Sequence, residues 1–121
     1  CAHYGMAPGF RKRMAARQRY FDESDGKITG FDYNLWFEFG TTGPEFVATL
    51  SYTLDTRLRG NRAPLLFGGH TDYYSPKYPG CATASLEERQ HAVTRFLDYA
   101  LEKDAVRVVP TRDVLRFVRG A

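Results

Sequence analysis

The chain has 121 residues, of which 43% are apolar and 15% aromatic, so one domain with a substantial core is possible. Its 17 basic and 14 acidic residues give a net charge of +3 that is spread along the chain except for a basic run at 11–19, which fits a solvated helix face, so we expect no nucleic-acid partner. No apolar run approaches the roughly 20 residues that span a bilayer, so we expect no transmembrane segment.

The N-terminal third predicts a loop, a short helix and an extended segment. Residues 1–9 are rich in glycine and proline, and residues 10–21 carry apolar side chains at loosely helical spacing. Over residues 31–39 every odd position is apolar or aromatic, and this period of two predicts a strand. Trp36 breaks the alternation. Its large amphipathic ring is either a binding platform or part of core or edge packing.

A helix is predicted to begin after Thr42. The sequence Thr42-Gly-Pro-Glu45 is a capping box with proline in the first turn, and Gly60 is a typical helix end. The apolar residues between them fall on one helical face: Phe46, Val47, Leu50, Leu54 and Leu58. A short apolar strand is predicted at 63–67.

The C-terminal part continues the alternation of helices and strands. Ser85-Leu-Glu-Glu88 is a second capping box, residues 106–109 form a short β-branched strand, and a last helix begins near Thr111. This order predicts an α/β fold with a parallel sheet. Two or three parallel strands cannot close a barrel or cover their own edges. We therefore expect the chain to be part of a larger β/α barrel.

The segment after the strand at 63–67 concentrates titratable and aromatic side chains. His70 follows two glycines, and Asp72, Tyr73 and Tyr74 come directly after it. Ligands of parallel α/β sheets bind outside the carboxyl ends of the strands, and histidine titrates near neutral pH. His70 is therefore a candidate general acid or base, with Asp72 either to orient it or to accept a hydroxyl, and with Tyr73 and Tyr74 to stack on a flat ligand such as a sugar ring. The alternative is a loop histidine bonded to a backbone carbonyl.

Other site classes find little support in the sequence. His3 and His91 fit exposed positions, and there is no His-x-x-x-His, no Cys-x-x-Cys and no Gly-x-Ser-x-Gly motif. We therefore expect no metal ligands within this chain. Whether Cys1 and Cys81 form a disulfide is left open by the sequence.

Several motifs together carry a family resemblance. They are Gly60-Asn-Arg-Ala-Pro-Leu-Leu-Phe-Gly-Gly-His70, a Tyr-Tyr-Ser-Pro loop, Phe96-Leu-Asp-Tyr-Ala-Leu-Glu-Lys103, the strand at 106–109 and Asp113-Val-Leu-Arg-Phe-Val118. This pattern resembles the C-terminal half of a polysaccharide deacetylase domain, the NodB-homology fold of carbohydrate esterase family 4. Phe31-Asp-Tyr-Asn-Leu-Trp36 resembles the segment just upstream. The resemblance covers residues 27–121, and we assign the whole chain, 1–121, to this portion of the domain.

The resemblance implies the C-terminal portion of a distorted (β/α) barrel and metal-dependent removal of N-acetyl groups from amino-sugar polymers such as chitin or peptidoglycan-like glycans. His70 matches the family's general acid, which protonates the leaving amine. Trp36 and Asp32 match its fourth motif in part, with one extra residue between them, and Trp36 would line the substrate groove. Asp32, Asp72, Tyr73 and Tyr74 are expected to contact substrate.

The resemblance also implies a divalent metal, with zinc the first choice. The family's early Asp-Asp and His-x-x-x-His motifs do not occur in this sequence, so we expect them in an upstream half of the same domain, before Cys1. A secreted or periplasmic location is implied as well. The alternative is a non-catalytic carbohydrate-binding or structural α/β module without metal ligands.

Overall fold

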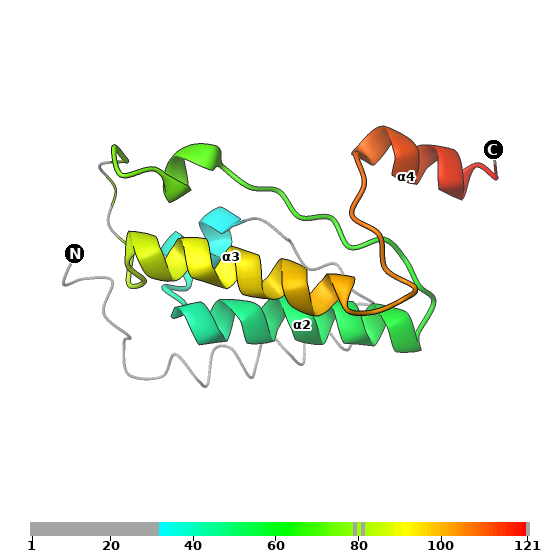
Figure 1. Cartoon of the computed structure of the whole chain (residues 1–121), viewed down its shortest axis with the longest axis horizontal. Coiled ribbons are helices and arrows are strands. Elements are labelled where there is room, and N and C mark those ends of the chain that lie inside the picture. Colours follow the sequence, from blue (N-terminus) through cyan, green and yellow to red (C-terminus); the bar gives the residue numbers. More distant parts are fainter. Residues whose placement is uncertain (1–31, 79, 81, 121) are drawn as a thin grey trace.

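Two long helices, α2 (Gly43–Arg59) and α3 (Leu86–Leu101), form the centre of the molecule. The computed structural model describes residues 32–78, 80 and 82–120. The two helices pack side by side and run in the same direction (Figure 1). Because parallel neighbours need a long return connection, residues 60–85 cross back from the end of α2 to the start of α3. The crossover carries the segment around His70.

Both helices begin at the predicted caps, so these predictions are confirmed. Thr42 Oγ1 accepts a hydrogen bond from the N–H of Glu45 at 3.3 Å. Ser85 Oγ accepts one from the N–H of Glu88 at 3.2 Å. Each cap satisfies an amide that has no partner inside its own helix.

The core lies between the two long helices. Its buried apolar side chains are Phe46, Leu50 and Leu54 from α2 and Ala92, Phe96 and Ala100 from α3, together with Leu35, Trp36 and Ala84. The ring of Trp36 stacks on that of Phe46, with centroids 4.2 Å apart and planes 4° from parallel. The helix pair and the segment before it therefore share one core.

A polar cluster joins the C-terminal halves of α2 and α3. Tyr99 Oη donates a hydrogen bond to Asp55 Oδ2 at 2.5 Å, and Lys103 Nζ lies 3.4 Å from Asp55 Oδ1. The ammonium of Lys103 also lies 4.3 Å from the centre of the Tyr99 ring. These contacts fix the register of one helix against the other.

The strand predicted over 31–39 is wrong for the residues that the structure describes there, because they form the π-helical turn η2 (Asn34–Glu38). The N–H of Phe39 donates to the carbonyl of Asn34 at 2.8 Å, the five-residue spacing of a π-helix. Asp32, Leu35 and Trp36 are buried at helical spacing. Burial of these three side chains therefore outweighs the alternating apolar pattern.

The end of η2 is fixed by a turn into α2. Gly40 has φ of +60°, a left-handed conformation that favours glycine. Both the N–H and the Oγ1 of Thr41 donate to the carbonyl of Leu35 at 3.0 Å. This turn places η2 against the start of α2.

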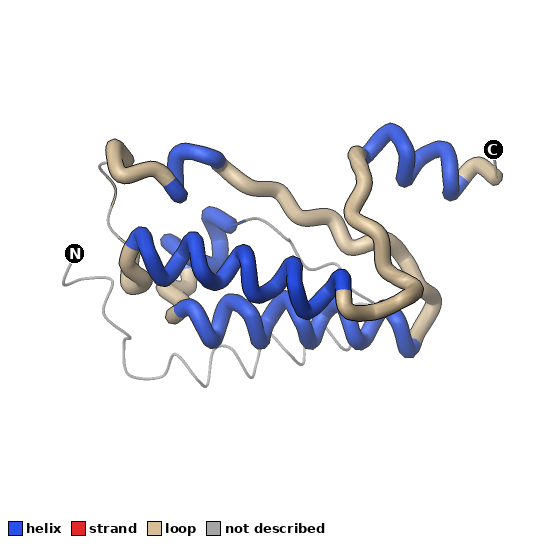
Figure 2. Tube along the Cα trace, viewed as in Figure 1, coloured by secondary structure: helices blue, strands red, loops and turns tan. Residues whose placement is uncertain are grey.

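The predicted α/β fold, the C-terminal portion of a distorted (β/α) barrel of the NodB-homology type, is contradicted by the structure. Figure 2 shows helices and loops but no strand in the part of the chain that is described. Residues 63–67 and 106–109, predicted as strands, run as loops, and no strand among the described residues pairs with either. Each segment instead packs a side chain, Leu65 or Val106, against the helix core.

The last helix, α4 (Thr111–Val118), begins where predicted, directly after Pro110, but lies apart from the helix pair (Figure 1). None of its residues is buried, and Phe117 is 82% exposed. No helix in the described part of the chain is long and apolar enough to cross a membrane. The helix predicted over 10–21 lies outside the described residues, as do Cys1 and Cys81.

Candidate functional site

The carboxylate of Asp32 holds His70 by two hydrogen bonds. Its Oδ1 lies 2.8 Å from Nδ1 of the imidazole, and its Oδ2 accepts the backbone N–H of His70 at 2.8 Å. The main chain of Asp32 adds a third link, since its N–H donates to the carbonyl of Gly68 at 3.1 Å. Asp32 is fully buried, and a buried carboxylate is stable only when it accepts hydrogen bonds. Both the ring and the backbone of His70 are thereby positioned.

Two further side chains complete this hydrogen-bond network. Tyr74 Oη donates to Asp32 Oδ2 at 3.0 Å, and Trp36 Nε1 donates to Tyr74 Oη at 3.2 Å. Burial, together with the nearby charge of Asp32, raises the pKa of Tyr74 far above its ordinary value, although the Trp36 hydrogen bond opposes this. Tyr74 is therefore a neutral donor over the physiological pH range.

The start of α3 holds η3 (Thr71–Tyr74), the short 3₁₀ turn that follows His70. Arg89 Nε donates to the carbonyl of Tyr73 at 2.9 Å, and its Nη1 donates to the carbonyl of Ala84 at 2.7 Å. Gln90 Nε2 donates to the carbonyl of Tyr74 at 2.8 Å. Burial lowers the pKa of Arg89. A buried guanidinium thus ties the site to the helix pair through main-chain carbonyls.

The imidazole of His70 is accessible on its outer side. Its side chain is 49% exposed, whereas the Asp32 carboxylate that it contacts is fully buried. Since an ionised carboxylate only accepts hydrogen bonds, Nδ1 carries a hydrogen and Nε2 is the nitrogen that a ligand can reach. A carboxylate that orients an imidazole in this way is a recurring arrangement in general acid–base catalysis.

An aromatic cluster lies beside His70. The ring of Tyr73 is 4.5 Å from the imidazole, and the rings of Phe37 and Tyr78 lie 4.8 Å and 4.9 Å from Tyr73. Tyr33 stacks on Phe37 at 5.9 Å and is 50% exposed. The cluster therefore joins the imidazole to an accessible aromatic ring, of the kind on which an apolar sugar face stacks.

The structure brings together four of the six side chains selected from the sequence, namely Asp32, Trp36, His70 and Tyr74. Tyr73 packs against the imidazole of His70 but is itself buried. Asp72 is exposed on η3, and the carboxylate hydrogen-bonded to the imidazole of His70 is that of Asp32. The role of orienting the imidazole, expected of Asp72, therefore belongs to Asp32.

The burial of Trp36 does not fit its expected place in a substrate groove. Its side chain is fully buried against Phe46, so the indole is not accessible to a ligand. The sequence did not indicate Tyr33, Tyr78 or Arg89 as site residues. The position of Tyr33 directly after Asp32 could have indicated it as a site residue. No local sequence pattern indicated Arg89.

The divalent metal that the resemblance implies, with its ligands upstream of Cys1, stays a prediction that the described residues do not test. Among them, no three histidine, cysteine, aspartate or glutamate side chains are grouped so as to hold a metal ion. Asp32 is already committed to three hydrogen-bond donors, and His70 uses Nδ1 on that carboxylate. The site as described is a carboxylate–imidazole pair, the Asp32–His70 site.

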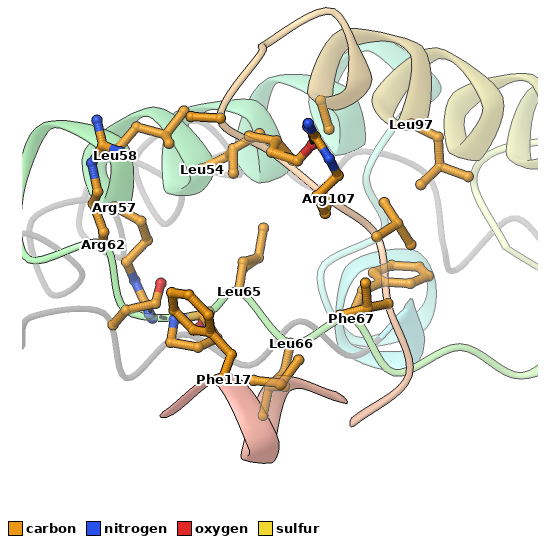
Figure 3. A pocket seen from close by; sticks show the side chains of 18 of the residues that line it. Leu54, Arg57, Leu58, Arg62, Leu65, Leu66, Phe67, Leu97, Arg107 and Phe117 are labelled. Atoms are coloured by element: carbon orange, nitrogen blue, oxygen red, sulfur yellow. Dashed lines mark hydrogen bonds between the residues drawn. The ribbon is translucent and has the colours of Figure 1, made fainter. Parts of the chain in front are cut away.

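A separate pocket of about 430 Å³ lies at the other end of the helix pair (Figure 3). Most of its lining side chains are apolar and come from α2, α3, α4 and the loop segments at 63–67 and 106–109, for example Leu54, Leu65 and Phe117. Arg57 and Arg107 also line it. None of Asp32, Trp36, His70 or Tyr74 does, so the pocket is distinct from the Asp32–His70 site.

The chain matches no protein-family model, no curated protein and no solved structure.

Proposed function

We propose that this chain provides the proton-transferring histidine of a hydrolase that removes N-acetyl groups from amino-sugar polymers such as chitin or peptidoglycan-like glycans. The observation that carries the proposal is the Asp32–His70 pair, in which a buried carboxylate holds a half-exposed imidazole at 2.8 Å. The deacetylase-like motifs around His70 indicate the substrate class. The proposal does not depend on a barrel fold.

The chemistry of acetamide hydrolysis explains why such a pair is useful. Water adds to the carbonyl carbon and loses a proton to a base that we place outside the described residues; the C–N bond then breaks, and the departing amine takes up a proton. We assign that proton to Nε2 of His70, with the negative charge of Asp32 stabilising the imidazolium before transfer. Because the described residues hold no metal-binding group, only proton transfer and substrate contact are assigned to them.

The aromatic cluster supports a sugar substrate. The half-exposed ring of Tyr33 and the rings of Phe37 and Tyr73 lead from the surface to the imidazole. A pyranose ring combines an apolar face with polar edges, so it suits an exposed tyrosine at the outer edge of such an aromatic cluster. Asp72, exposed next to His70, is placed to accept a hydrogen bond from a sugar hydroxyl.

The proposal is tested by acetate release from an N-acetylglucosamine tetramer, measured with added zinc on the intact protein that carries this chain. We expect His70→Asn to lower the rate about 10²- to 10⁴-fold. The matched control is His91→Asn, which changes an exposed histidine on α3 and leaves the rate unchanged. Full activity of His70→Asn, or no acetate release by the wild type, would refute the proposal. Tetramer binding without release would favour the non-catalytic carbohydrate-binding alternative.

A further inference from the structure

The hydroxyl of Tyr74 lies in the middle of a hydrogen-bond chain that begins at Trp36 and ends at His70. We infer that Tyr74 is a positioning residue: its hydroxyl, held by the Trp36 indole, fixes the Asp32 carboxylate so that His70 keeps a hydrogen on Nδ1 and presents Nε2 outward. The residue does not need to touch the substrate. It acts through Asp32.

Donor chemistry sets the direction of the bonds in this chain. An indole N–H can only donate, so the hydroxyl of Tyr74 accepts from Trp36 at 3.2 Å and gives its own hydrogen to Asp32 at 3.0 Å. The same oxygen, Oδ2, also accepts the backbone N–H of His70 at 2.8 Å. The other oxygen, Oδ1, lies 2.8 Å from Nδ1, and because an ionised carboxylate only accepts hydrogen bonds, we assign the hydrogen of that contact to Nδ1.

The chain is also anchored at its far end. Trp36 is fully buried and stacks on Phe46 in the helix core. The carbonyl of Tyr74 accepts a hydrogen bond from Gln90 at 2.8 Å, so its backbone is tied to α3. The hydroxyl is therefore fixed from two sides, and the rotation of the Asp32 carboxylate is restricted with it.

Phenylalanine in place of Tyr74 separates positioning from packing. Phenylalanine keeps the aromatic ring, but among the described residues Asp32 Oδ2 then keeps only the backbone N–H of His70 as a donor, and Trp36 Nε1 loses the acceptor that Tyr74 provides. A carboxylate with fewer donors rotates more freely. The imidazole then populates the Nε2–H form as well, which is the preferred form of free neutral histidine.

The inference is tested by the tautomer of His70 in the ¹⁵N-labelled chain, read from long-range ¹H–¹⁵N couplings at a pH where the ring is neutral. We expect the wild type to show mainly Nδ1–H, and Tyr74→Phe to raise the Nε2–H population by about twofold or more. The matched control is Tyr99→Phe, which removes the same kind of tyrosine–aspartate bond between α2 and α3. It should leave the tautomer unchanged. An unchanged tautomer in Tyr74→Phe overturns the inference.

A second measurement uses the unmodified protein, in case Tyr74→Phe does not fold. Because Tyr74 and His70 share the carboxylate of Asp32, the ¹³Cζ shift of Tyr74 should change as the imidazole gains its second proton. A ¹³Cζ shift that stays flat overturns the inference. The role of Tyr74 in turnover rests on the proposed function, but neither the tautomer nor the ¹³Cζ measurement needs a substrate. A failed acetate-release test would therefore not change the tautomer result, and an unchanged tautomer would not change the acetate-release result.

Discussion

At the scale of single residues, Asp32 is the side chain on which the site depends most. Its fully buried carboxylate accepts hydrogen bonds from Tyr74 and from both the ring and the backbone of His70. Removing one partner from a buried network of charged and polar groups leaves the remaining groups buried without a hydrogen-bond partner. The carboxylate therefore contributes to folding as well as to the proposed chemistry.

We expect Asp32→Asn to lower the free energy of unfolding by about 2–4 kcal/mol, because the amide NH₂ must face one of the three donors. Urea unfolding at neutral pH measures this loss. The control is Asp72→Asn, which alters an exposed carboxylate on η3 and should change stability by less than about 0.5 kcal/mol. Equal midpoints for Asp32→Asn and the wild type would contradict the prediction.

Residue chemistry also explains what the sequence revealed of the site. His70 and Tyr74 were selected as titratable and aromatic side chains after a predicted strand, and Asp32 and Trp36 through their partial match to a motif of the family that the sequence resembles. The contact between Asp32 and His70 could not be predicted from the sequence, because the two residues are 38 positions apart and the crossover brings them together. Asp72, the nearer carboxylate in sequence, was therefore given the orienting role that Asp32 has.

At the scale of elements, local signals predicted helices well and extended segments poorly. The caps at Thr42 and Ser85 act within four residues, so they fix where α2 and α3 begin in any surroundings. A strand needs a partner from elsewhere in the chain. Residues 63–67 and 106–109 find none among the described residues, and the segment at 31–39 buries side chains at helical spacing instead.

The attachment of η3 to α3 leads to a prediction at this scale. Arg89 donates to the carbonyls of Tyr73 and Ala84. Leucine at position 89 would leave both carbonyls without this donor. We expect Arg89→Leu to lower the free energy of unfolding by about 2–4 kcal/mol. Hydrogen exchange at the amides of Tyr73 and Ser75, which are bonded within this turn, should speed up more than exchange within α2.

The matched control for this prediction is Arg95→Leu, because Arg95 is an exposed arginine of the same helix. It removes a charge from α3 without removing a donor to η3. Its stability should stay within about 0.5 kcal/mol of the wild type. Uniform acceleration of exchange across η3 and α2 in Arg89→Leu would show general destabilisation rather than release of the turn.

At the scale of the whole molecule, the resemblance predicted a barrel that the structure does not form. The described residues pack as a parallel helix pair with one long crossover, and their core is built between α2 and α3. The Asp32–His70 pair forms without a sheet among the described residues, because both side chains are positioned by η2, by the crossover and by the start of α3.

Alkaline pH provides a test of the whole molecule, because the pKa of Tyr73, Tyr74 and Tyr99 is raised in the folded state. Burial is the main cause for Tyr73 and Tyr74, and the hydrogen bond to Asp55 is the main cause for Tyr99. A tyrosine whose pKa is higher in the folded state keeps its hydroxyl proton over a pH range in which the same tyrosine in the unfolded chain has already lost it. The stability that it contributes is present below the unfolded pKa of about 10 and is lost as pH rises beyond it.

We therefore expect the free energy of unfolding to fall as pH rises above about 10, with a slope of up to about 1.4 kcal/mol per pH unit for each such tyrosine. Tyr74→Phe removes one of these groups, so its curve should fall less steeply than that of the wild type, although it starts from a lower stability at neutral pH. Urea unfolding at intervals from pH 7 to pH 11 measures both curves. Between pH 7 and pH 9 their difference should be nearly constant, because this range lies below the unfolded tyrosine pKa of about 10. Parallel curves up to pH 11 would mean that Tyr74 ionises equally well in the folded and unfolded chain, and that its hydroxyl is not held in the network with Asp32 and Trp36.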